Sequence, residues 1–267
     1  MPTNREAIQG GVWNEPLQYS SDMAIIDDVL RSLPHRDAPV REVRLGLRAS
    51  AVWSIRVGLA YAFPRDPAAR PLDEGSAPAP GDSPARLGDR SAGELADLAR
   101  SKDYESASLG LAAIQSVLPL PAGIVDGLVF DWILHHGAGK RIGMVGHFPM
   151  VDRLRPLARA VDVLELTPQE GDLPAEAAPR VLPQADVVVI SGSTLVNHTL
   201  DDLLALVRGK PVLLLGPSSP LSPVLFDHGV SVVCGAIVID PLEALRDVSE
   251  GLGFRRMRGL RRVMLTK

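Results

Sequence analysis

The second half of the chain alternates short apolar runs with helical segments, and this rhythm constrains the fold most. Strand-like runs are expected at residues 142–145, 163–166, 187–190, 212–215 and 232–238. Helices are expected between and after them, at 150–160, 175–182, 200–207, 220–227 and 242–249. Strands that are apolar on both faces and alternate with helices are typical of a parallel sheet covered on both sides. We therefore predict a Rossmann-like α/β domain over 126–267, with 262–265 as an edge strand.

The first half has a different pattern, which predicts a smaller α+β domain over 1–125. Apolar residues at helical spacing predict a helix within 23–33. Two strand-like runs, 40–49 and 52–63, are expected to form an antiparallel pair. Ser91 and Glu94 form a capping-box pattern for a helix to about residue 100, and further helices are expected over 104–118 and 125–135.

Residues 64–90 contain six prolines among Gly, Ala, Ser and Asp. Such a segment buries too little apolar surface to order itself, so we expect a surface loop. An insertion without function is the favoured interpretation, and a lid over a binding site is the alternative.

The composition limits the classes of partner that the chain is expected to bind. The net charge is −4 and the pI about 5.9, which gives no overall attraction to nucleic acid or anionic membranes. Cys234 is the single cysteine, so no internal disulfide can form, and no apolar run resembles a signal peptide or a membrane helix. We expect a cytoplasmic protein that binds neither nucleic acid nor membrane; a homo-oligomer is left open.

The candidate ligand site follows from the ends of the predicted strands, because ligands of such sheets bind outside the carboxyl ends. Small, polar or turn-forming residues predominate there, and the expected ligand-binding residues are Gly146, His147, Phe148, Pro149, Glu165, Gly192, Ser193, Thr194, Asn197, Gly216, Pro217 and Ser218. His147 is either a metal ligand or acid/base group or a structural histidine bonded to backbone. Glu165 lies where a Rossmann acidic residue would bind a ribose, but the loop lacks G-x-G-x-x-G.

The hydroxyl and amide groups near the third and fourth strand ends also have two interpretations. Ser193, Thr194 and Asn197 are residue types that cap helices, yet their number also favours a bound anion or polar ligand. Gly216-Pro217-Ser218 begins a turn whose backbone N–H groups suit a carboxylate or phosphate. The sequence contains neither of the metal-site signatures H-E-x-x-H and C-x-x-C.

Four motifs occur in an order that resembles one family. They are Val-Gly-His-Phe-Pro at 145–149, Glu-Leu-Thr-Pro at 165–168 with Gly-Asp-Leu-Pro at 171–174, the run 185–197, and Leu-Gly-Pro-Ser-Ser-Pro-Leu-Ser-Pro at 215–223. The chain resembles the bacterial and archaeal proteins described by the phrase "putative heavy-metal chelation". The resemblance implies an enolase N-terminal-like domain before a Rossmann-like domain, with a ligand cleft between them. It brings no catalytic residues.

Our first functional hypothesis is binding of a divalent or heavy-metal ion, or of a metal-bearing small molecule, in that cleft. His147 and Glu165 are the best metal ligands by residue type, and Cys234 would favour a softer metal if it faced the cleft, although a buried hydrophobic cysteine is more common. The alternative is an enzyme that binds a nucleotide or another anionic small molecule, with His147 as acid/base. A third hypothesis is a scaffold that uses the proline-rich segment and the arginines near the C-terminal end.

Overall fold

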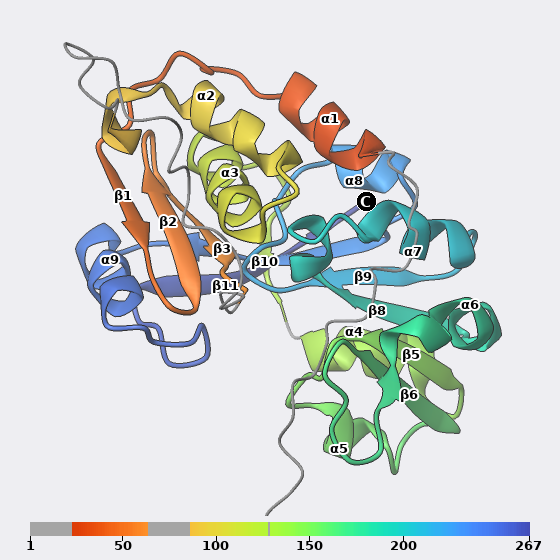
Figure 1. Cartoon of the computed structure of the whole chain (residues 1–267). Coiled ribbons are helices and arrows are strands. Elements are labelled where there is room, and N and C mark those ends of the chain that lie inside the picture. Colours follow the sequence, from red (N-terminus) through yellow and green to blue (C-terminus); the bar gives the residue numbers. More distant parts are fainter. Residues whose placement is uncertain (1–22, 64–85, 128) are drawn as a thin grey trace, which may run out of the picture.

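The protein is described here from a computed structural model, which defines residues 23–63, 86–127 and 129–267. These residues form an eight-stranded, mostly parallel sheet and a smaller three-stranded antiparallel sheet, both flanked by helices (Figure 1). The expected mixed α/β class is confirmed, with the large parallel sheet in the second half of the chain and the small unit in the first.

The large sheet has the strand order β4-β11-β10-β9-β8-β5-β6-β7. Its strands are β4 (Val125–Asp126), β5 (Arg141–Val145), β6 (Ala160–Glu165), β7 (Leu173–Pro174), β8 (Val187–Ser191), β9 (Val212–Leu215), β10 (Val232–Val238) and β11 (Leu260–Thr266). The strands from β5 to β10 run parallel, and β11 pairs antiparallel with β10 and with β4. The strand order reverses at β5, because β6 lies on one side of it and β8 on the other. Such a reversal is where a parallel sheet opens a crevice for a ligand.

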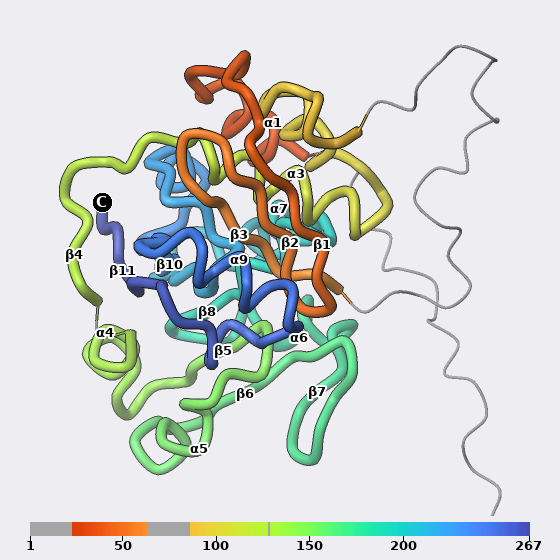
Figure 2. The backbone as a smooth tube through the Cα atoms, turned by 90° about the vertical axis from the view of Figure 1, so that its left-hand side faces the viewer, coloured from red at the N-terminus to blue at the C-terminus, as the bar shows by residue number. Residues whose placement is uncertain are grey.

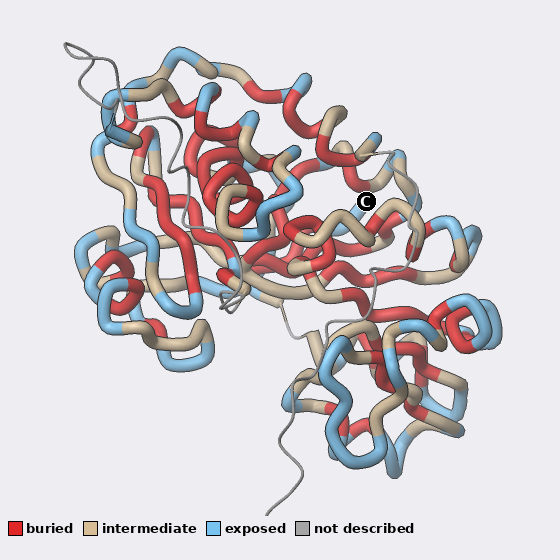
Figure 3. The backbone as a smooth tube through the Cα atoms, viewed as in Figure 1, coloured by how far each residue is buried: buried red, intermediate tan, exposed pale blue. Residues whose placement is uncertain are grey.

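The central strands are buried on both faces, and Val187–Ile190 and Val212–Leu214 are almost inaccessible to solvent (Figure 3). On one face they pack against α4 (Val129–Gly137) and α5 (Val151–Leu154). On the other face lie α6 (Ala178–Val181), α7 (Leu200–Leu206) and α8 (Val224–Asp227). Short 3₁₀ turns at Ala175–Ala177, Leu182–Gln184 and Gly192–Leu195 complete the connections. The two covered faces explain why the strand sequences are apolar throughout.

The small sheet consists of β1 (Glu42–Leu45), β2 (Ala49–Trp53) and β3 (Val57–Tyr61), each antiparallel to the next. The prediction of only two strands was wrong. The run 40–49 turns at Gly46, whose N–H donates to the carbonyl of Ala49, so that three residues separate the end of β1 from the start of β2. α9 (Pro241–Ser249) packs against this sheet through Leu245 and Val248 (Figure 2).

Three further helices belong to the first half: α1 (Ala24–Arg31), α2 (Ala92–Ala96) and α3 (Tyr104–Val117). The capping box is present, because Ser91 Oγ accepts the N–H of Glu94 while the Glu94 carboxylate accepts the N–H of Ser91 at 2.7 Å. α2 passes into a 3₁₀ turn at Asp97–Arg100, and another such turn covers Leu87–Asp89. Residues 64–85, which make up most of the proline-rich segment, lie outside the described residues.

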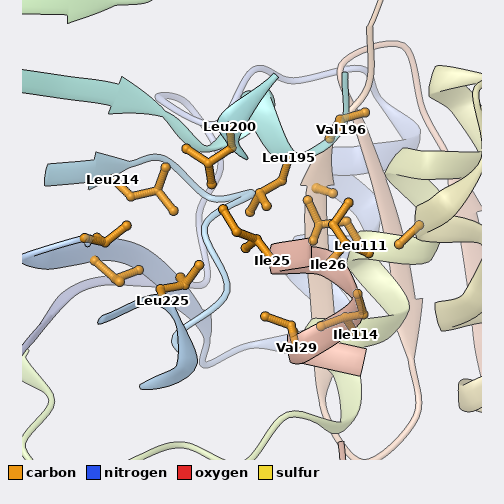
Figure 4. Packing of buried hydrophobic residues seen from close by; sticks show 14 of the residues in the cluster. Ile25, Ile26, Val29, Leu111, Ile114, Leu195, Val196, Leu200, Leu214 and Leu225 are labelled. Atoms are coloured by element: carbon orange, nitrogen blue, oxygen red, sulfur yellow. The ribbon is translucent and has the colours of Figure 1, made fainter. Parts of the chain in front are cut away.

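The two halves share one hydrophobic core (Figure 4). Ile25, Ile26 and Val29 on α1 pack in the same cluster as Leu200 on α7 and Leu225 on α8. Polar contacts reinforce this junction: the Nε2 atom of His228 lies 2.8 Å from Asp28 Oδ2. The halves are therefore joined by a packed interface, and the domain boundary near residue 125 stays a prediction.

Two of the expected helices need correction. The helix predicted over 150–160 is only one turn long, because after Leu154 the chain turns tightly into β6, which already begins at Ala160. The predicted helix 125–135 begins later, since Val125 and Asp126 form an edge strand on β11. The strand predicted at 262–265 is confirmed as part of β11, but its expected edge position is wrong, because β4 pairs with its outer side. No helix among the described residues is long and apolar enough to cross a membrane.

Candidate functional site

The loops after β5 and β8 approach each other closely at the carboxyl ends of the strands. Gly146 ends β5 with φ +106°, a left-handed conformation that favours glycine. A Cβ atom on Gly146 would lie 3.2 Å from the Cβ of Ser191, at the end of β8. The absence of a side chain at Gly146 thus lets the two loops meet at the strand reversal.

The loops after β8 and β9 are in contact as well. A Cβ atom on Gly192 would lie 2.4 Å from Ser219 Oγ and 2.8 Å from the Ser219 backbone nitrogen, so only glycine fits there. Gly216, with φ +133°, donates its N–H to the carbonyl of Cys234 on β10. Ser219 Oγ is buried and has no hydrogen-bond partner among the described residues. The ends of β5, β8 and β9 and the middle of β10 are therefore linked by close backbone approaches.

His147 is held by two acidic residues, one at the end of β6 and the other in the turn that follows β6. Its backbone N–H donates to Glu165 Oε1 at 2.6 Å, and the second Glu165 oxygen accepts the N–H of Leu166 at 3.2 Å. The ring atom Nδ1 lies 3.0 Å from both carboxylate oxygens of Asp172. The Asp172 side chain is fully buried, whereas a quarter of the His147 side chain (26%) remains exposed. The carboxylate favours a proton on Nδ1, which leaves the lone pair of Nε2 available.

The predicted hydroxyl and amide residues make mostly local hydrogen bonds. Ser193 Oγ lies 2.8 Å from Ser191 Oγ, and Thr194 Oγ1 donates to the carbonyl of Ser191. The side-chain oxygen of Asn197 accepts a hydrogen bond from Thr199 at 2.8 Å. These contacts shape the 3₁₀ turn after β8. Such local hydrogen bonds fit the structural interpretation of these residues, which was the alternative to ligand binding.

The loop after β9 is tied to the first half of the chain. Ser218 Oγ accepts the N–H of Tyr61, the last residue of β3, at 2.7 Å. The side-chain amide of Gln115, on α3, donates to the carbonyl of Pro217 at 3.0 Å and also to that of Leu59. Ser218 is therefore a buried link between the halves, with 1% of its surface exposed.

The remaining predicted residues lie apart from the polar groups. Phe148 packs against the apolar cluster that contains Met144 and Leu154, and Pro149 is exposed in the turn before α5. The Cys234 side chain is buried in the same cluster as Phe148. Burial raises the pKa of its thiol to about 12. A metal ligand must be a thiolate, so this environment opposes metal binding by Cys234.

The donor set around His147 is that of a single imidazole ligand. A carboxylate on the other ring nitrogen is the usual environment of a metal-binding histidine, because it fixes the tautomer and the ring orientation. Both nearby carboxylates are already engaged, Asp172 by the ring and Glu165 by two backbone N–H groups. Across the described residues, no group of three or more His, Cys, Asp or Glu side chains is arranged to hold a metal ion.

Comparison with known proteins places the chain in a family. The model of the family DUF364, described as "Putative heavy-metal chelation", matches residues 128–267, which is more than half of the chain. The chain belongs to the DUF364 family. The model of DUF4213, which carries the same description, matches residues 26–118. The expected family relationship is thereby confirmed.

Solved DUF364 structures share the fold over nearly the whole chain. A DUF364 protein of unknown function from Desulfitobacterium hafniense is 29% identical, with a TM-score of 0.75 over 91% of this chain and 98% of that one. A DUF364 protein from Pyrococcus horikoshii, 22% identical, gives a TM-score of 0.74 with the same coverage. An uncharacterized protein of Methanocaldococcus jannaschii is 32% identical over 163 residues. That match spans 57% of this chain and 62% of the relative's length, less than two thirds.

Sequence reasoning missed Asp172, although it lies within one of the motifs that define the resemblance. The residue follows β6 in a turn closed by the hydrogen bond from the Asp172 N–H to the carbonyl of Gln169. Nothing local in the sequence shows that this turn folds back over His147. Gln115 and Tyr61 were missed for a similar reason, since their partners lie about a hundred or more positions away in the chain.

Proposed function

We propose that this protein binds a metal ion carried by a small-molecule chelator, with Nε2 of His147 as the ligand from the protein. The observation that carries this proposal is the pairing of His147 Nδ1 with the buried carboxylate of Asp172. The pairing leaves Nε2 as the ligand atom of a partly exposed imidazole. The family description, "Putative heavy-metal chelation", agrees with a metal ligand of this kind.

The other coordination positions are assigned to the chelator. Asp172 supports the imidazole, and Glu165 holds the backbone of His147 and Leu166, so neither carboxylate is free to approach a metal without breaking these contacts. The glycines at 146, 192 and 216 keep the neighbouring strand ends free of side chains. The N–H groups of Gly146, His147 and Gly216 already donate within the chain, so a chelator with carboxylate or phosphate groups would bind other polar groups at these ends.

The test uses untagged protein and nickel(II) nitrilotriacetate, whose chelator leaves coordination positions open. Calorimetry should show binding by the wild type and at least tenfold weaker binding by His147→Ala. His135→Ala is the matched control, because His135 is an exposed histidine on α4. Equal affinity in the wild type and His147→Ala would overturn the proposal, and so would an equal loss in His135→Ala.

A second candidate rests on the same pair of residues. A carboxylate that holds Nδ1 of a histidine also equips Nε2 as a general base. The strand reversal beside His147 is where such sheets bind nucleotides. This enzyme would bind a nucleotide or another anionic small molecule without metal. Thermal-shift measurements with nucleotides, S-adenosylmethionine and organic acids in excess EDTA distinguish the two, since a stabilised protein under these conditions favours the enzyme.

The scaffold hypothesis receives less support. The proline-rich segment lies mostly outside the described residues, and two of the C-terminal arginines are engaged within the chain. Arg258 pairs with Glu243 at 3.2 Å, and Arg261 pairs with Asp126 at 2.6 Å. These pairs give both arginines a structural role, because they connect Arg258 to α9 and Arg261 to β4. A partner that binds these arginines would have to compete with both pairs.

A further inference from the structure

Arg56 has a cationic group that no residue of the described chain neutralises. It lies in the turn between β2 and β3, and its backbone N–H donates to the carbonyl of Ser116 at 3.1 Å. Its Nη1 atom is buried and has no hydrogen-bond partner among the described residues. Burial lowers the pKa of Arg56, because the charged form loses contact with water. A buried nitrogen of this kind is costly, and native proteins nearly always give it an acceptor.

A hollow beside Arg56 offers space for such an acceptor. It lies between the two halves of the chain, against the start of β3, the end of α3 and the end of β10. Its lining is Arg56, Val57, Gly58, Gln115, Leu118, Leu120, Leu221, Ala236, Ile237 and Val238. No acidic residue lines it, and none of the ligand-binding residues expected from the sequence does. The hollow is therefore distinct from the surroundings of His147.

The size and the lining of the hollow restrict what can enter. Its volume is about 20 Å³, and one water molecule needs about 10–15 Å³ on the same scale. That is room for a small head group and not for a whole ligand. The side-chain NH₂ group of Gln115 already donates to the carbonyls of Leu59 and Pro217, so Arg56 is the remaining side-chain donor in the lining. Leu120, which is 45% exposed, continues the apolar lining toward solvent.

We propose that this hollow binds the carboxylate of a small amphiphilic acid, with Arg56 on the carboxylate and the hydrocarbon chain over Leu118 and Leu120. A guanidinium matches a carboxylate in charge and in geometry. The apolar walls exclude competing water and strengthen the contact. Because the lining comes from both halves, an occupied hollow also stabilises the junction between α3 and β10.

The probe is sodium hexanoate, compared with 1-hexanol at fixed ionic strength and with the full chain. Hexanoate should bind the wild type and raise its Tm, and 1-hexanol should do neither at the same concentration. Arg56→Met, which keeps the length of the side chain and removes the charge, should bind hexanoate at least tenfold more weakly. Arg246→Met is the matched control, because Arg246 is exposed on α9 and outside the lining, and it should bind like the wild type.

The outcomes separate this proposal from a structural role of Arg56. Arg56→Met removes an unpaired buried nitrogen, so it should fold with a Tm no lower than that of the wild type without ligand. Hexanoate binding that survives in Arg56→Met overturns the proposal, and so does an equal Tm shift with 1-hexanol or no binding of hexanoate at all. Arg56→Lys should recover part of the affinity. His147→Ala should leave hexanoate binding unchanged, which keeps this result independent of the metal experiment.

Discussion

The Nδ1 atom of His147 lies 3.0 Å from each carboxylate oxygen of Asp172, an acidic side chain with no exposed surface. The two residues come from different turns, one after β5 and the other after β6. The same carboxylate also accepts the N–H of Gln169 at 3.1 Å, which anchors it in its own turn. The imidazole is thus held at Nδ1 by an anchored carboxylate, and a quarter of the His147 side chain (26%) stays exposed.

Asp172→Asn should weaken binding of nickel(II) nitrilotriacetate by about 10–100-fold. The amide can turn its oxygen toward Gln169 N–H, and its NH₂ group then faces His147 Nδ1. This favours the tautomer with the proton on Nε2, which removes the lone pair needed for the metal. Calorimetry measures the effect, with Asp152→Asn on the exposed side of α5 as the control. Unchanged affinity in Asp172→Asn would show that Asp172 does not orient a metal ligand.

Gly192→Ala should destabilise the protein by about 1–3 kcal/mol. The added methyl group would lie 2.8 Å from the backbone nitrogen of Ser219, so the loops after β8 and β9 would have to separate. Gly88→Ala is the control, because a Cβ at Gly88 meets no atom within 4 Å. Urea denaturation followed by tryptophan fluorescence gives both values. Equal stability of the two variants would mean that the loops are less closely packed than described.

Asp201→Asn should stabilise the protein at neutral pH, and the gain should shrink in acid. Burial raises the pKa of Asp201 above its ordinary value, although the N–H of Ile25, donated to the carboxylate at 3.2 Å, and the nearby His228 oppose the shift. The folded state therefore holds the proton more tightly than the unfolded state, so ionisation above the raised pKa costs stability. Asparagine avoids this cost and retains an acceptor for Ile25.

The check on Asp201 is urea denaturation at a series of pH values. The difference between Asp201→Asn and the wild type should close as the pH falls through the raised pKa of Asp201 toward and below its ordinary value. Asp227→Asn, an exposed substitution on α8, should show no such trend. A difference that grows as the pH falls would contradict the assigned direction of the shift.

Cys234 should react with iodoacetamide about a thousandfold more slowly in the native protein than an ordinary thiol does at pH 8. The reagent attacks the thiolate, and a rise of the pKa from 9.0 to about 12 lowers the thiolate fraction by that factor. In denaturant the rate should return to that of a free cysteine. Mass spectrometry follows the reaction without ambiguity, because the chain has one cysteine. Rapid modification of the native protein would show that Cys234 is accessible.

The sequence predicted the strands better than the contacts between their ends. β9 and β10 occur at their expected residues, because an apolar run bounded by turn residues is a local signal. The boundaries of helices in short connections were less accessible: α5 is cut to one turn by the path of the chain into β6. The role of Glu165 as an acceptor for the N–H of His147 also depends on two strands lying side by side.

Residue type suggested His147 as a candidate, and the structure shows that Glu165 and Asp172 hold it. The same reasoning could not separate Ser218, whose hydroxyl joins the halves through Tyr61, from a residue that faces a ligand. It also could not show that Cys234 packs in the apolar cluster with α4 and α5. A strand that is buried on both faces has no alternation of apolar and polar residues from which the face could be predicted. Arg56 carried no signal at all, since an unpaired cation is defined by what surrounds it.

The hydrophobic core that α1 shares with α7 and α8 has a consequence for how the protein unfolds. Ile25 and Leu225, two hundred positions apart, are each buried only while the other half of the chain is folded. A cut between the segments matched by the two family models would expose this surface on both pieces. We therefore expect calorimetry to show one cooperative transition for the intact chain, and the separated pieces to gain structure only when they are mixed.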